Sequence, residues 1–113
     1  MQALSRAVSK TEPTIKIDIY IAGDLEQAKQ ICRKWTLEVG ACVTVEAVSY
    51  IYSGGEETGV RVGFINYPRF PTDHETLFNR AADLGHVLMT GLCQLSFSIV
   101  SPVRTEWVSR RPE

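Results

Sequence analysis

The chain has 113 residues, with 12 basic and 13 acidic side chains and a net charge of −1. One domain is expected, because domains of about 100–150 residues are the commonest size. The charge balance lacks the basic surplus typical of nucleic-acid binders, and no apolar run reaches the roughly 18 residues of a membrane span, so neither nucleic acid nor membrane is an expected partner.

The N-terminal segment is polar and lacks both periodicity and the apolar core of a signal peptide, which predicts a flexible arm over residues 1–13. Four isoleucines then alternate with polar residues from Ile15 to Ile21. This period of two, carried by β-branched residues, is typical of a strand with one buried face.

A helix is expected after this strand. Gly23 interrupts the alternation, and Asp24 with Gln27 three residues later matches an N-cap and its capping-box partner. Apolar residues at helical spacing follow on one face, and Gly40 is typical of the residue after a helix C-terminus.

A hairpin is predicted next. The segment from Cys42 to Tyr52 is rich in valine, threonine and tyrosine and is expected to be a strand. Its apolar positions change phase between Ala47 and Ser49, which predicts either a β-bulge or a long strand leaving the domain. A glycine-rich turn over residues 53–57 then leads into a third strand over residues 58–65.

A second helix is expected to begin at Thr72, since Thr72 and Glu75 match a capping box. It ends either at Gly85 or near Thr90. Alternation over residues 92–100 predicts a last strand, which Pro102 ends. The residues from 103 onward are expected to form a short basic tail.

The element order β-α-β-β-α-β predicts an α+β fold, a ferredoxin-like sandwich with an antiparallel sheet and two helices on one face. The domain is expected over residues 14–108, with a C-terminal tail over residues 109–113. The layer between sheet and helices is expected to bury the alternating isoleucines together with Leu25, Cys32, Trp35, Phe64, Phe78, Cys93 and Phe97.

The other sheet face is expected to be polar, because an antiparallel sheet can leave one face to solvent. The simplest interpretation is a solvated face, and the alternative is an oligomer interface or a ligand site. Tyr20 alone does not provide the exposed aromatic rings that single-stranded RNA needs. The residues of this face would be Lys16, Asp18, Tyr20, Thr44, Glu46, Arg61, Gln94, Ser96 and Ser98.

The run Gly40-Ala41-Cys42-Val43, followed by Tyr50-Ile51-Tyr52, a glycine turn and another strand, resembles the CutA divalent-cation-tolerance family, as does the late pair Trp107-Val108. The resemblance implies a ferredoxin-like subunit, a homotrimer with hairpins reaching between subunits, and a ligand or metal role. Thr44 replaces the asparagine of the family's pattern, the hairpin tryptophan is absent, and PII-like and ACT-like modules share the element order.

Candidate ligand-binding residues lie on the polar face and the hairpin. Lys16, Tyr20 and Arg61 are expected to lie close together and to suit an anionic or nucleotide-like ligand, with Tyr50 and Tyr52 nearby. No catalytic residue is nominated, because no nucleophile–base or carboxylate pair is evident from spacing.

Candidate metal ligands are Cys42 and His86, since thiolate and imidazole groups bind copper or zinc. The commoner role of a single cysteine is that of a small buried hydrophobic residue. The three cysteines fit neither a disulfide framework nor a CxxC pair, which favours free thiols in a reducing cytoplasm.

The leading functional hypothesis is a non-catalytic homo-oligomer, a trimer, that binds a small anionic or nucleotide-like ligand in clefts between subunits. One alternative is CutA-like binding of copper or zinc. Another is a protein-interaction or structural module, which an exposed Trp107 would favour. An enzyme ranks lowest, although catalytic residues can converge from distant positions.

Overall fold

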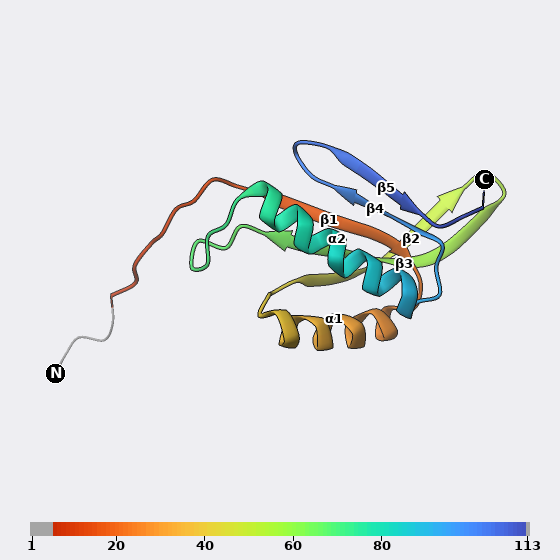
Figure 1. Ribbon diagram of the computed structural model, residues 1–113, viewed down its shortest axis with the longest axis horizontal. Coiled ribbons are helices and arrows are strands. Elements are labelled where there is room, and N and C mark those ends of the chain that lie inside the picture. Colours follow the sequence, from red (N-terminus) through yellow and green to blue (C-terminus); the bar gives the residue numbers. More distant parts are fainter. Residues whose placement is uncertain (1–5, 113) are drawn as a thin grey trace.

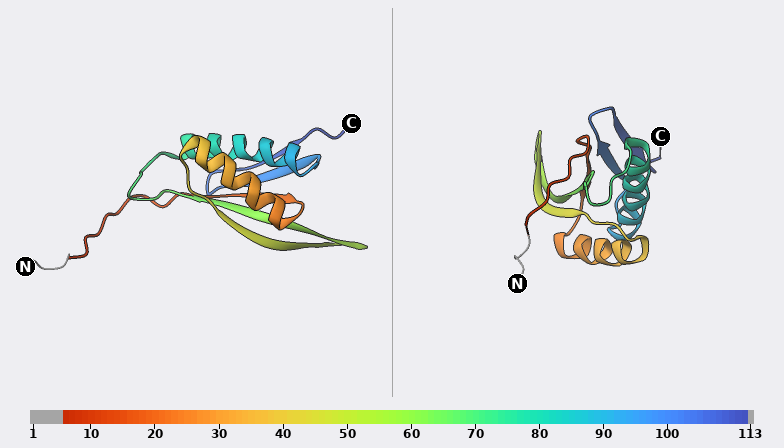
Figure 2. Two further views of the ribbon diagram at one scale, coloured as in Figure 1. Left: turned by 90° about the horizontal axis from the view of Figure 1, so that it is seen from below. Right: turned by 90° about the vertical axis from the view of Figure 1, so that its left-hand side faces the viewer.

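A computed structural model describes residues 6–112, which form a five-stranded antiparallel sheet covered by two helices on one face (Figures 1 and 2). The strand order is β2-β3-β1-β4-β5, and the predicted α+β, ferredoxin-like class is confirmed. In the described range no helix combines the length and apolar character needed to cross a membrane. The elements are β1 (Lys16–Ala22), α1 (Leu25–Val39), β2 (Thr44–Tyr52), β3 (Gly55–Ile65), α2 (His74–Gly91), β4 (Ser96–Val100) and β5 (Thr105–Ser109).

The fifth strand corrects the prediction of a tail from residue 103. β5 pairs with β4 from Ser96–Ser109 to Val100–Thr105. Pro102 lies in the turn between them, where the Ser101 hydroxyl accepts the Arg104 backbone N–H at 3.1 Å. The proline therefore starts a hairpin turn, a position that suits its fixed φ, and does not end the sheet.

Both helices begin at an aspartate. The Asp24 carboxylate accepts the Gln27 backbone N–H at 2.9 Å, as the sequence predicts. The second N-cap is Asp73, one residue after the expected Thr72, and its carboxylate accepts the Thr76 backbone N–H at 3.2 Å. α2 continues past Gly85, where a β-carbon would lie 2.6 Å from Phe97 Cζ. This glycine allows close approach of helix and sheet.

The core lies between the helices and the sheet, as predicted. Trp35 packs edge-on against Phe64, with ring centroids 6.0 Å apart. Cys93 is not part of it: because α2 extends to Gly91, Cys93 falls in the exposed connection before β4, with φ 57°. Ile15 and Leu25 are half-buried against a core that includes Ile17, Ile19, Ile21, Cys32, Trp35, Phe64, Phe78 and Phe97.

The β2–β3 hairpin is longer than the sheet that supports it. Its pairing is continuous from Thr44–Gly63 to Tyr52–Gly55, whereas β1 accompanies β3 only as far as Gly59. Residues 49–58 therefore project as a two-stranded ribbon, seen beyond the helices in the left view of Figure 2. This explains the phase change near Ala47: a long strand leaves the domain, and the β-bulge alternative is wrong.

Candidate ligand site on the open sheet face

One residue from each strand forms a row across the sheet face that the helices leave open. Glu46 pairs with Arg61, Arg61 with Tyr20, Tyr20 with Ser98, and Ser98 with Trp107. Residues directly opposite each other in a sheet share a face. The isoleucines on either side of Tyr20 are buried in the core, so the row lies on the open face.

An ion pair occupies one end of this row. Arg61 Nη2 lies 2.6 Å from Glu46 Oε1, and Arg61 Nε lies 3.2 Å from the same oxygen. Contacts with Glu46, and then with Tyr20, raise the pKa of Arg61 above its usual value. Since Glu46 already balances the Arg61 charge, Arg61 is a weaker anion site than the sequence predicts.

Tyr50 reaches the same face from the base of the ribbon. Its ring covers Gly59, where a β-carbon would contact the ring and lie 2.5 Å from the Ile21 carbonyl oxygen. Its hydroxyl donates to the Val60 carbonyl oxygen at 3.1 Å. Burial raises the pKa of Tyr50 to about 12, so its hydroxyl remains a neutral hydrogen-bond donor.

A hollow of about 190 Å³ lies where β1, β4, β5 and the base of the ribbon meet. Small-molecule sites combine aromatic walls with a few placed polar groups, and complete pockets usually enclose about 300–1,000 Å³. The hollow is thus smaller than a complete small-molecule pocket. Its lining side chains include Tyr20, Tyr50, Glu57, Gln94, Ser96, Ser98, Trp107 and Arg111.

The structure brings together some of the predicted ligand residues. Tyr20 and Arg61 are cross-strand neighbours, and Tyr20 and Tyr50 line the same hollow. Lys16 lies four residues from Tyr20 along β1, or about 13 Å. Tyr52 is 55% exposed near the tip of the ribbon. Neither Lys16 nor Tyr52 is among the residues that line the hollow.

Sequence reasoning misses three residues of the hollow: Glu57, Trp107 and Arg111. It places Glu57 in the hairpin turn, and the other two in or beside the C-terminal tail. The pattern Thr-Glu-Trp-Val-Ser at positions 105–109 contains β-branched and aromatic residues, and this composition after a proline turn is the signal that indicates a returning strand.

The candidate metal ligands line different hollows. Cys42 is exposed, contrary to the buried interpretation, and its Sγ lies 3.5 Å from Tyr67 Oη. This contact with Cys42 raises the pKa of Tyr67. His86 lies edge-on to Phe97, with ring centroids 5.4 Å apart. Over residues 6–112 no group of three metal-binding side chains is found. A metal site at Cys42 or His86 stays a prediction.

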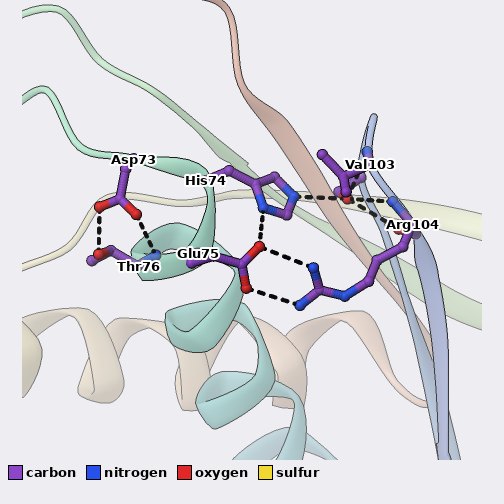
Figure 3. Close-up of polar contacts among 7 residues, drawn as sticks. Asp73, His74, Glu75, Thr76, Val103 and Arg104 are labelled. Atoms are coloured by element: carbon purple, nitrogen blue, oxygen red, sulfur yellow. Dashed lines mark hydrogen bonds and ion pairs between the residues drawn. The ribbon is translucent and has the colours of Figure 1, made fainter.

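A second polar cluster lies where the start of α2 meets the β4–β5 turn (Figure 3). Arg104 donates to both oxygens of Glu75 at 3.0 and 3.1 Å, and lies 3.9 Å over the Phe78 ring. His74 bridges Glu75, at 2.7 Å, and the Ser101 hydroxyl, at 3.0 Å. The charged groups of this cluster bind one another, so the cluster links the β4–β5 turn to the start of α2.

No protein-family model and no curated protein matches the chain. Among solved structures, an apo phage SAM lyase is 12% identical at TM-score 0.64, covering 99% of each chain. A phage SAM lyase in complex with S-methyl-5'-thioadenosine is 12% identical at TM-score 0.62, covering 93% of this chain and 96% of that one. CutA from Archaeoglobus fulgidus is 15% identical at TM-score 0.46, covering 89% and 88%. The likenesses to the two phage SAM lyase structures show a shared fold. CutA, which the sequence resembles, is among the structural matches, and this match is a weak one.

Proposed function

We propose that the chain binds S-adenosylmethionine (SAM) and S-methyl-5'-thioadenosine (MTA) in the open-face hollow, and that it cleaves SAM as a lyase. The observation that carries the proposal is the composition of the hollow, which combines the aromatic side chains of Tyr20, Tyr50 and Trp107 with one carboxylate and one guanidinium. The fold shared over almost the whole chain with a phage SAM lyase, which was solved with MTA, supports this ligand class.

The charges of the hollow complement those of SAM. Glu57 belongs to β3 and Arg111 follows β5, so the two side chains approach the hollow from opposite sides. A carboxylate attracts the sulfonium cation, and a guanidinium binds the substrate carboxylate through paired hydrogen bonds. Tyr20 and Tyr50 provide ring faces that also attract a cation.

Lyase chemistry at this site needs no co-reactant. Loss of MTA from SAM breaks the bond between the sulfur and the four-carbon amino-acid chain, and the electron pair of that bond remains on sulfur as a neutral thioether. The carbon fragment either bonds to its own carboxylate oxygen or loses a proton to water and becomes an alkene. The chain's part is to hold the substrate in a reactive conformation.

We propose in addition that the protein is a homo-oligomer, through its ribbon. Ile51 is 78% exposed and Tyr52 is 55% exposed on strands that no third strand supports. An isolated two-stranded ribbon is marginally stable in water, so packing against a second copy would stabilise it. A neighbouring subunit could also enclose the part of the ligand that the hollow of about 190 Å³ leaves uncovered.

The test is incubation with SAM and chromatographic detection of MTA, together with calorimetric titration of MTA. Arg111→Ala is expected to slow MTA release from SAM and to leave the affinity for MTA, which has no carboxylate, nearly unchanged. Arg110→Ala is the matched control, because Arg110 Nη2 donates to Thr90 Oγ1 at 3.2 Å, at the end of α2.

Each result decides one part of the proposal. The lyase would be supported if the wild-type protein releases MTA from SAM, if Arg111→Ala slows this release, and if Arg110→Ala does not. Binding of MTA without cleavage of SAM would overturn the lyase and favour a non-catalytic binder. A folded protein that neither binds MTA nor cleaves SAM would overturn the whole proposal.

A further inference from the structure

We infer that Tyr20 and Trp107 form the two walls of a slot that holds the adenine ring of the ligand, with Ser98 as its floor. The inference rests on the proposed function and adds the subsite that recognises the base. Tyr20 and Trp107 are both direct cross-strand partners of Ser98, on β1 and β5 respectively. The two aromatic residues therefore stand on the same face with one small residue between them.

The spacing of the walls suits one planar ring. Directly opposite Cβ atoms in an antiparallel pair are about 5 Å apart, so the Cβ atoms of Tyr20 and Trp107 are about 10 Å apart. A ring stacked between two others occupies two contact distances of about 3.5 Å each, or about 7 Å in total. The remaining space of about 3 Å is less than the contact distance of about 3.5 Å that a second stacked ring would need.

Ser98 keeps the slot open because its side chain is short. A leucine or phenylalanine at position 98 would fill the space between Tyr20 and Trp107. The polar groups beside the slot, on Gln94, Ser96 and Ser98, can both donate and accept hydrogen bonds. A purine edge carries donors and acceptors together, so these groups match it better than they match an apolar ring.

Trp107 is 62% exposed. Among the described residues, the paired rings are those of Trp35, His74 and His86, each with a phenylalanine, and Trp107 is in none of these pairs. An exposed indole face provides a surface on which a base can stack. Loss of such a stacking contact by alanine substitution lowers affinity by about 5- to 150-fold. The opposite wall is held in place: Tyr20 is half-buried beside Arg61, which Glu46 binds.

Tryptophan fluorescence tests the slot. The chain has two tryptophans, so Trp35→Phe leaves Trp107 as the sole indole. Titration with MTA is expected to quench Trp107 emission in parallel with calorimetric binding. Trp107→Ala is expected to weaken MTA binding about tenfold, and Trp107→Phe to retain most of the affinity. If Trp35→Phe unfolds, the difference in emission between wild type and Trp107→Phe gives the same signal.

Ser98→Leu is expected to abolish MTA binding by filling the slot. Its matched control is Thr105→Val, on the same face of the adjacent strand and one row away. The slot would be overturned if MTA binds by calorimetry but leaves Trp107 emission unchanged, and if Trp107→Ala binds MTA as tightly as wild type. The proposed function would stand in that case. No binding of MTA to the wild-type protein would overturn both. The Trp107 variants still decide the matter if Ser98→Leu does not fold.

Discussion

The ring of Tyr50 lies over Gly59, in the space that any side chain at position 59 would occupy. Tyr50 is on the edge strand β2, and its hydroxyl reaches across β3 to within 3.5 Å of the Ile21 carbonyl oxygen of β1. The absence of a side chain at Gly59 thus lets one aromatic residue lie flat across the sheet. This contact shapes the wall of the hollow nearest the ribbon.

Gly59→Ala is expected to destabilise the fold and to weaken MTA binding. The added methyl group would displace Tyr50 and also approach the Ile21 carbonyl oxygen at 2.5 Å, which rotation of a side chain cannot relieve. Overpacking of this kind costs about 1–3 kcal/mol. Urea denaturation measures the loss, with Thr58→Ala on the same strand as control. An unchanged midpoint would show that Tyr50 does not lie over Gly59 in solution.

Glu57→Gln is expected to weaken the binding of SAM more than the binding of MTA. SAM carries a sulfonium cation and MTA a neutral thioether, so only SAM loses a charge interaction with position 57. For a partly exposed pair the expected loss is about threefold in affinity. The KM for SAM from initial rates and the calorimetric affinity for MTA, both at low salt, give the two effects to be compared. Glu56→Gln makes the same charge change one residue away, on the opposite face of the ribbon, and equal effects of the two variants would contradict the role of Glu57.

The polar cluster of α2 is expected to make stability fall at acidic pH. Hydrogen bonds from Arg104, and then from His74, lower the pKa of Glu75 to about 2. Because the folded-state pKa is depressed, this contribution is fully present above the unfolded-state pKa of about 4.3 and is lost as pH falls towards 2. The difference in melting temperature between wild type and Glu75→Gln should therefore be fully developed at pH 5 and shrink below pH 4. A difference that stays the same at pH 2.5 would contradict this.

The sequence predicts the sheet better than it predicts the site, for a physical reason. The alternation of residues along a strand decides which face each residue occupies, so alternation alone is enough to place Tyr20 and Arg61 on the same face. It is not enough to place Trp107, because Pro102 is compatible both with the end of a strand and with a hairpin turn. Glu57 lies in a Gly-Gly-Glu-Glu segment of low β-propensity, and the pairing of β2 with β3 overrides that local preference.

Thiol reactivity is expected to separate the three cysteines. Burial raises the pKa of Cys32 to about 11, and its side chain lies in the core. At pH 8 only roughly 0.1% of such a thiol is thiolate, the reactive form. Cys42 and Cys93 are exposed, so a thiol reagent should label two cysteines quickly and the third only after denaturation. Rapid labelling of all three in the folded protein would contradict the buried position of Cys32.

The solution mass tests the role of the ribbon. One chain has a mass of 12.6 kDa, so a trimer, at three times that value, would measure about 38 kDa by light scattering. Ile51→Lys is expected to shift the oligomer to the monomer mass, because a charge would be buried without a partner where the exposed Ile51 side chain packs.

The matched control is Glu56→Lys, since Glu56 is the cross-strand partner of Ile51 and is already polar. This variant should keep the wild-type mass if apolar packing of Ile51 drives assembly. Equal dissociation of both variants would instead indicate that charge near the ribbon tip controls assembly. A wild-type protein that is monomeric at micromolar concentration would contradict the oligomer itself, and the hollow of a single subunit would then have to bind MTA alone.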